Sequence, residues 1–277
     1  GGGSVPGPAC GDPGAKVDRL DLLLAIDNSR GMSEKQKILA LSLPELVSHL
    51  VNPPCVDPDT LAPQSSPATP DEACPAGTER ELEPPRDIHI GIVSSSLGGH
   101  GSDACGTVAP ADPSNDDMAH LLARKAPSDP AEVETYQSLK FLAWDPQQQL
   151  DPPGEADLGA DTAADPDMTA LLPSLTDMDG GVGEIGCGYE SQLESWYRFL
   201  IDPTPPEEVT LDAEGKVLLK GTDTVLLDQR RAFLRPDSLL AIVMLTDEND
   251  CSIREQGQFY YAAQQKAGNG SVFHLPR

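Results

Sequence analysis

Two short apolar runs, each followed by an acidic residue, constrain the fold of this chain more than any other feature. Residues 20–26 (LDLLLAI) and 239–245 (LLAIVML) have the length of a strand and lack a polar face. Runs of this kind are typical of strands buried on both faces, as in parallel sheets. Asp27 follows the first run directly, and Asp247 follows the second after a single threonine. The sequence therefore predicts two buried strands whose carboxyl ends carry carboxylates.

Strand and helix patterns alternate along the rest of the chain. A third buried strand is expected at residues 87–94 (DIHIGIVS), and a fourth strand at 272–275. Pro44 is expected to kink or split the first helix, because proline removes a helical hydrogen bond. The alternation predicts the α/β class, with a three-layer α/β/α domain built on a mostly parallel, doubly wound sheet. Helices are expected over residues 33–51, 118–125, 131–143, 189–201 and 256–267.

Long polar segments separate these elements. Residues 145–184 contain ten acidic residues and no Lys or Arg, so we expect this segment to contribute little to a core. A hairpin is predicted across residues 209–219. Because the chain stops just after a predicted strand, the domain is expected to be incomplete at its C-terminus. We expect a flexible Gly/Pro-rich lead at residues 1–16, then one domain over 17–277 with insertions near 52–86, 98–117, 145–185 and 202–236.

The charge of the chain limits its partners. The formal net charge is -26, which repels nucleic acid and anionic lipid surfaces and attracts divalent cations. No apolar run approaches the roughly 18–20 residues needed to span a bilayer. Residues 1–14 do not resemble a signal peptide, so for an exported protein the signal would have been removed or would lie upstream. The Gly/Pro-rich start also resembles the tether after a lipid anchor, although Cys10 has no lipobox before it.

The cysteines favour an oxidising compartment. Five of the six cysteines lie in segments rich in Pro, Gly, Asp or Glu, where buried reduced thiols are rare. An even number in loops favours disulfides, although a cytosolic protein with six reduced thiols is the alternative. Cys55 and Cys74 belong to one loop and are expected to pair.

The acids that end the two apolar runs indicate a binding site. Ligands of open parallel sheets bind beyond the carboxyl ends of the strands. If the two strands are neighbours, Asp27, Ser29 and Asp247 converge there. Carboxylates and a hydroxyl are hard oxygen ligands, which suit Mg²⁺, Mn²⁺ or Ca²⁺ better than zinc.

These residues also resemble the motif of a known family. Residues 27–31 (DNSRG) are similar to the Asp-x-Ser-x-Ser motif of von Willebrand factor A (VWA) domains, and residues 245–247 (LTD) to the strand end that carries the family's distal Asp. Residues 186–190 (GCGYE) lie where the family places a metal-site Thr. The similarity covers residues 18–277. It is greatest to the exported bacterial branch, which has an Asp-Asn-Ser start and an acidic Thr-Asp-Glu run followed by Cys.

The resemblance implies a metal-ion-dependent adhesion site (MIDAS). In such a site the protein leaves one coordination position open for an acidic group of a protein or glycan partner. Gly31 and Cys187 depart from the motif, because neither supplies an oxygen ligand. The resemblance also places Cys187 and Cys251 on opposite sides of the site, where we expect them to pair. The residues that could substitute as ligands are Glu184, Glu190, Glu248, Asn249 and Asp250.

Three functions compete on this evidence. The first is an exported binding module in the periplasm, anchored to the outer membrane or on the cell surface. The second is a structural or envelope protein with a vestigial metal site, in which Asp27 caps a helix and Asp247 binds loop N–H groups. The third is a metal-assisted hydrolase with Asp27 as nucleophile. Asp27 does not begin an Asp-x-Asp motif, because residue 29 is serine, and the chain has no recognisable general base, so we expect no enzyme activity. The two expected disulfides, Cys55–Cys74 and Cys187–Cys251, leave Cys10 to pair with Cys105 or with a cysteine beyond Arg277.

Overall fold

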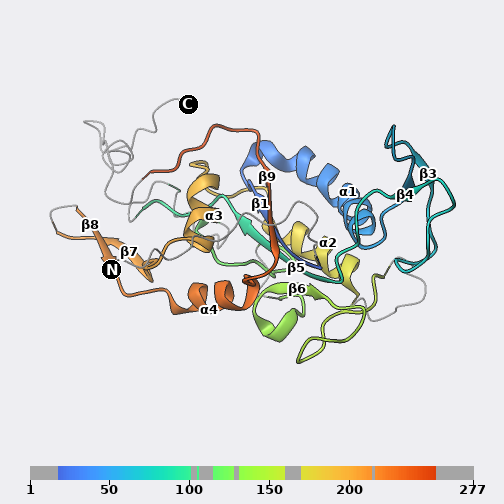
Figure 1. Ribbon diagram of the computed structural model, residues 1–277. Helices are drawn as coiled ribbons and strands as arrows, with labels where there is room; N and C mark the ends of the chain where they lie inside the picture. The colour runs from blue at the N-terminus through green and yellow to red at the C-terminus, as the bar shows by residue number, and fades with distance from the viewer. Residues whose placement is uncertain are drawn as a thin grey trace, which may run out of the picture.

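A four-stranded mixed sheet forms the centre of the protein (Figure 1). The computed structural model describes residues 18–100, 105, 115–127, 131–159, 170–213 and 216–253. The strand order is β6-β5-β1-β9, in which β1 pairs in parallel with β5 and β9, and β6 runs antiparallel to β5. The chain is therefore an α/β protein. The strands are β1 (Arg19–Ile26), β5 (Asp87–Ser94), β6 (Phe141–Trp144) and β9 (Leu239–Leu245).

Helices pack against both faces of this sheet, and β1 shows why. Leu22 and Leu24 belong to a cluster with residues of α1 and α2, whereas Leu23 belongs to a second cluster with residues of α3 and α4. Burying each such leucine contributes about 1.5–3 kcal/mol. A strand that is apolar on both faces therefore needs helices on both sides. These helices are α1 (Ser33–Val51), α2 (Leu171–Val182), α3 (Gln192–Leu200) and α4 (Thr224–Phe233).

Two small β structures extend from opposite ends of the molecule (Figure 1). The first has the order β3-β2-β4 and is tied to the loop by the Cys55–Cys74 disulfide, which the sequence predicted. The second is the predicted hairpin. The strands of these two structures are β2 (Cys55–Val56), β3 (Pro63–Ser65), β4 (Glu79–Arg80), β7 (Glu208–Leu211) and β8 (Val217–Lys220).

The prediction of two helices between residues 118 and 143 is wrong. This stretch contains irregular backbone, the short 3-10 helix η3 (Tyr136–Ser138) and the strand β6. Met118, Ala119 and Lys140 have positive φ angles, which an α-helix of L-residues does not adopt. The apolar residues of this stretch are therefore buried without helical structure.

Two other helices differ from expectation. Helix α1 follows a 3-10 turn, η1 (Arg30–Met32), and continues through Pro44, so of the two expected effects of this proline, a kink or a split, the split is wrong. Leu43 and Val47 on either side of the proline are buried in the core, and this packing holds the helix together. The segment expected to contribute little to the core contains α2, where Leu175 and Met178 are fully buried.

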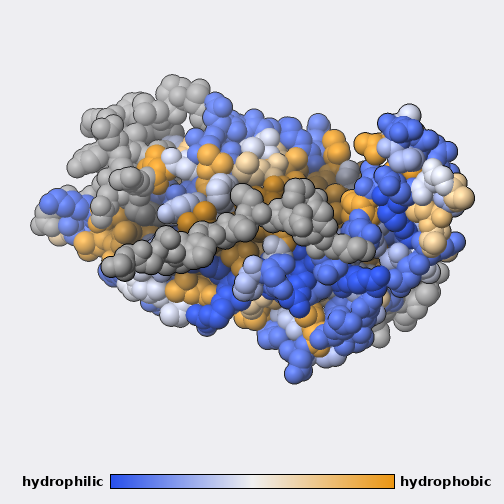
Figure 2. All heavy atoms as spheres, viewed as in Figure 1, coloured by the Kyte–Doolittle hydropathy of each residue, from blue (hydrophilic) through white to orange (hydrophobic). Residues whose placement is uncertain are grey.

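Strand β9 has the predicted bounds but not the predicted burial. It is the last strand of the sheet among the described residues, with Leu239 52% exposed and Met244 47% exposed. Figure 2 shows hydrophobic side chains along the middle of this face, where Figure 1 places β9. The expected helix at 256–267 and the expected strand at 272–275 lie outside the described residues.

Candidate functional site

The carboxyl ends of β5, β1 and β9 meet at one edge of the sheet. Ile26 is in register with Ser94 on one side and with Leu245 on the other. The ladder continues past the strands, because the Asp27 amide donates to the Leu245 carbonyl at 2.9 Å. Residues that follow these strands therefore lie side by side, as the sequence predicted for Asp27 and Asp247.

Asp27 is fully buried and held by groups from several elements. Its Oδ1 accepts a hydrogen bond from the Ser29 amide at 2.8 Å and a longer one from Ser95 Oγ at 3.4 Å. Its Oδ2 accepts from Thr246 Oγ1 at 2.9 Å. Helix α1 contributes Gln36, whose Nε2 donates to the Asp27 carbonyl at 2.9 Å. The carboxylate therefore has a fixed orientation at the end of β1.

Ser29 has a buried hydroxyl group at the end of β1. Its side chain is 4% exposed, and its Oγ is buried with no hydrogen-bond partner among the described residues. A buried hydroxyl without a partner costs about 1–3 kcal/mol. Because the Ser29 amide is bonded to the Asp27 carboxylate, the hydroxyl lies beside a fixed negative charge. Such a pair of oxygen groups fits a hard cation.

Asp247 approaches the same turn from β9 and is paired with a lysine. A Cβ placed on Gly31 would come within 2.8 Å of Asp247 Oδ2, so the carboxylate lies against the Gly31 backbone. Lys35 Nζ donates to Asp247 Oδ2 at 2.6 Å and to the Gly31 carbonyl at 3.0 Å. The hydrogen bond to Asp247 raises the pKa of Lys35. Glycine at position 31, where the motif has a second Ser, leaves room for this ion pair.

The residues that were expected to substitute as metal ligands lie in different surroundings. Asp250 Oδ1 accepts from the Leu193 amide at 3.0 Å at the start of α3, and its Oδ2 accepts from the Ser252 amide. Glu184 lines a separate cavity between α1 and α2. Glu190 is buried, and its carbonyl accepts from the Cys251 amide. The side chains of Glu248 and Asn249 are exposed.

The expected Cys187–Cys251 disulfide is wrong. Cys187 is bonded to Cys105, with a Cα–Cα distance of 4.9 Å, which also excludes a Cys10–Cys105 bond. The Cys187 amide donates to Ser96 Oγ at 2.9 Å, so Cys187 lies against the segment that follows β5 and leads to Cys105. Its sulfur is therefore not available as a metal ligand. Cys10 lies outside the described residues.

Sequence reasoning missed four polar groups of this site: Lys35, Gln36, Ser95 and Thr246. Lys35 follows Gly31 by four residues, and the helical pattern of residues 33–51 could have placed it above that glycine. Ser95 and Thr246 reach Asp27 only through the register of β5, β1 and β9, which a single sequence does not define. Within the described part of the chain, no three His, Cys, Asp or Glu side chains form a metal-binding group. The site offers two carboxylates and hydroxyl groups.

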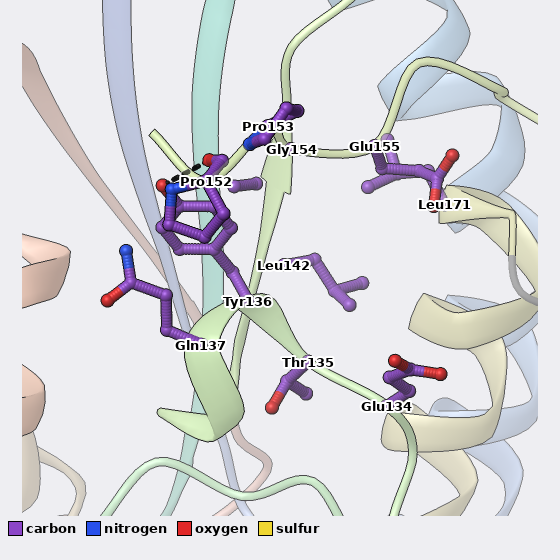
Figure 3. A pocket seen from close by; sticks show the side chains of 11 residues that line it. Glu134, Thr135, Tyr136, Gln137, Leu142, Pro152, Pro153, Gly154, Glu155 and Leu171 are labelled. Carbon is purple, nitrogen blue, oxygen red and sulfur yellow. Dashed lines mark hydrogen bonds between the residues drawn. The ribbon is translucent and has the colours of Figure 1, made fainter. Parts of the chain in front are cut away.

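A separate pocket of about 390 Å³ lies beside β6 (Figure 3). Tyr136 donates from its hydroxyl to the Pro152 carbonyl at 2.8 Å, and Leu142 and Leu171 form part of the wall. Glu155 accepts hydrogen bonds from the two amides that follow it, so its carboxylate serves its own turn. This pocket shares no lining residue with the site at the strand ends.

The chain matches no protein-family model, no curated protein and no solved structure. In the portion that the structure describes, no helix has both the length and the apolar character needed to cross a membrane. Two disulfides join cysteines of the described ranges, which fits an exported protein. Any proposal for the function of this chain therefore rests on the residues at the strand ends.

Proposed function

We propose that this chain is an exported VWA-type domain that binds a divalent cation at the strand-end site. Through the cation it would hold an acidic group of a protein or glycan partner. The observation that carries this proposal is the buried hydroxyl of Ser29, which has no partner among the described residues and lies beside the fixed Asp27 carboxylate. Asp247 on the adjacent strand adds a second carboxylate.

The arrangement of the sheet supports the three-layer, doubly wound fold of this proposal. Parallel strands β5, β1 and β9 carry the site at their carboxyl ends, which is where open α/β sheets bind ligands. Residues of α1 and α2 pack on one face, and residues of α3 and α4 pack on the other. The two disulfides support the periplasm, the outer membrane or the cell surface as the location.

Each residue of the site has a distinct role in this proposal. Asp27, Ser29 and Asp247 would hold Mg²⁺, or Mn²⁺ or Ca²⁺ in its place, and the bound cation would supply positive charge for an acidic partner group. Thr246 orients Asp27 by donating to its Oδ2. Lys35 competes with the cation for Asp247, so its ammonium must move aside when the site is filled.

Binding of a cation is expected to raise the melting temperature. A ligand at a hundred times its Kd stabilises the folded state by about 2.7 kcal/mol, equivalent to several degrees for a domain of this size. We expect this shift with Mg²⁺, Mn²⁺ or Ca²⁺ relative to EDTA, measured by calorimetry. Ser29→Ala should abolish the shift, whereas Ser33→Ala in the first turn of α1 should retain it. No shift with any of the three cations would contradict the proposal.

Removing the lysine that competes for Asp247 is expected to tighten cation binding. Lys35→Met eliminates a positive charge beside the site and releases Asp247, so the affinity for Mn²⁺ should rise about fivefold. Lys37→Met is the matched control, since it makes the same change on the same helix but Lys37 Nζ contacts Ser33 Oγ. Isothermal titration calorimetry measures both affinities. Equal effects of the two variants would show that Lys35 acts only through net charge.

A structural protein with a vestigial metal site is the second candidate. The Lys35–Asp247 ion pair and the Cys105–Cys187 disulfide favour it, because both occupy groups at positions where the motif supplies ligands. Crystals soaked in Mn²⁺ separate the two candidates. Anomalous density among Asp27, Ser29 and Asp247 would support the binding module, and its absence at saturating Mn²⁺ would support the structural protein.

A further inference from the structure

A cavity of about 400 Å³ lies between α1 and the C-terminal half of α2. It is separate from the strand-end site, although Gln36 belongs to both, since its Nε2 donates to the Asp27 carbonyl. The wall combines small or apolar residues with a few polar ones. The residues that matter here are Gln36, Lys37, Ala40, Asp179, Glu184 and Ile185.

Asp179 is the unusual residue of this cavity. Its side chain is 1% exposed, and its Oδ1 is buried with no hydrogen-bond partner among the described residues. Burial without a compensating partner raises the pKa of this carboxyl to about 6. An ionised carboxylate in such a position is costly unless a donor or a positive charge reaches it.

Other buried aspartates in the described part of the chain differ from Asp179. Asp21 accepts from Arg235 and Ser238, and Asp117 pairs with Arg124. Asp145 accepts from the backbone amides of residues 149, 150 and 154. Asp223 pairs with His120. The fold thus supplies partners for these carboxylates, whereas Asp179 lines a cavity and its Oδ1 has no partner among the described residues.

Two cationic side chains in this part of the fold have other contacts. Lys37 Nζ contacts Ser33 Oγ one turn away on α1, at 3.4 Å. Arg124 donates to Asp117 and to the Gly181 carbonyl, near the end of α2. Neither side chain is hydrogen-bonded to Asp179, so within the described part of the chain the Asp179 Oδ1 has no donor.

The chemistry of the wall defines the kind of donor that would fit. Ala40, Ile185 and the glycines of the α2 end suit an apolar stem, and Asp179 suits a head group with a positive charge and several N–H groups. Only two carboxylates line the cavity, Asp179 and Glu184, which is few for a metal ion that takes six or more oxygen ligands. A methylene chain that ends in an ammonium has both properties. The negative net charge of the protein also attracts such cations.

We infer that the cavity between α1 and α2 is a second binding site, which takes an alkylammonium group and pairs it with Asp179. The ammonium belongs either to a free amine or to the lysine side chain of a partner. The site is independent of the proposed cation site, because its ligand pairs with a different carboxylate.

NMR titration of the full chain with n-butylamine tests this inference. We expect the amide signals of residues 36–40 and 179–186 to shift. Asp179→Asn, which keeps the shape but removes the charge, should weaken binding at least tenfold. Asp177→Asn is the matched control, because it makes the same change on α2 outside the cavity lining. Ala40→Leu fills the cavity from α1 and should also abolish binding while Asp179 remains.

Titrations with two other compounds identify the source of the ammonium and test whether a metal ion binds instead. Binding of Nα-acetyl-lysine N-methylamide as well as n-butylamine would assign the site to lysine side chains, and binding of n-butylamine alone would assign it to free amines. Absence of shifts with both compounds, or equal shifts in wild type and Asp179→Asn, would overturn the inference. The same shifts produced by Ca²⁺ would overturn the alkylammonium assignment.

The pH dependence provides an independent readout. The ammonium binds the ionised carboxylate, so affinity should fall as pH drops through about 6, the pKa of Asp179. The charged groups that face Asp179 across the cavity are Lys37 from α1 and Glu184 from the segment after α2. Saturating n-butylamine should lower the pKa of Asp179, followed by the ¹³C shift of its carboxyl. An unchanged pKa at saturation would contradict direct pairing.

Discussion

Replacing Arg235 with methionine is expected to destabilise the protein by about 3–5 kcal/mol, because it leaves a buried carboxylate without its charge partner. Asp21 lies near the start of the core strand β1 and is fully buried. Arg235 Nε donates to Asp21 Oδ1 at 2.9 Å, and the Arg235 amide donates to Oδ2 at 2.9 Å. Ser238 Oγ donates to the same carboxylate. Urea unfolding followed by circular dichroism measures the loss.

A control and a rescue make this test specific. Arg231→Met removes an exposed ion pair with Asp228 from the last turns of α4, and its effect should stay below about 1 kcal/mol. Combining Arg235→Met with Asp21→Leu removes both charges, which should recover most of the lost stability. If Arg235→Met alone cost less than about 1 kcal/mol, the ion pair would not be important for stability.

Loss of the Cys105–Cys187 disulfide is expected to cost about 4.5 kcal/mol in the chain-entropy model, because its two cysteines are far apart in sequence. The separation is 82 residues, against 19 for Cys55–Cys74. The double variant Cys105→Ser/Cys187→Ser should therefore unfold at a lower guanidinium concentration than Cys55→Ser/Cys74→Ser. Equilibrium unfolding without reductant compares the two.

The same variant also tests whether this disulfide shapes the strand-end site. The Cys187 amide donates to Ser96 Oγ, which in turn donates to Asn28 Oδ1 at 2.7 Å, next to Asp27. Cation affinity should fall in Cys105→Ser/Cys187→Ser and stay unchanged in Cys55→Ser/Cys74→Ser, whose cysteines lie in the loop that carries β2. If the two double variants lost the same free energy of unfolding, the number of residues between the paired cysteines would not be the dominant effect on stability.

The sequence predicted the bounds of the long apolar strands β1, β5 and β9 well, because their signal is local, and it missed the short strands β2, β3, β4 and β6. Strand β5 has the predicted bounds, and β1 begins one residue before residues 20–26. Continuous apolar runs of this length have few alternatives in an α/β chain. The exposure of β9 could not be predicted, because burial depends on which elements cover a strand and not on its own composition.

Helix α2 was missed although its signal was present. Leu171, Leu175, Met178 and Val182 repeat at helical spacing and are all buried. The acidic composition of residues 145–184 obscured this stripe, and Pro173 and the glycines near the helix end have low helix propensity. Packing against α1 and the sheet outweighs that propensity.

The candidate site was predictable where it is local and not where it depends on packing. Asp27 and Ser29 lie in one turn, so their proximity follows from the sequence alone. The contact between Lys35 and Asp247 requires the position of α1 relative to β9, and the partner of Cys187 requires the path of the loop after β5. Side chains that meet across elements distant in sequence carry no local signal.

The half-exposed strand β9 determines how this protein is best handled in solution. Among the described residues β9 is the last strand of the sheet, and edge strands with exposed apolar side chains are templates for pairing between copies. The net charge of -26 keeps copies apart, but this repulsion acts only over the Debye length, which shrinks from about 30 Å at 0.01 M salt to about 3 Å at 1 M. Concentrated stocks therefore belong in low-salt buffer, and salting-out steps during purification favour aggregation through this edge.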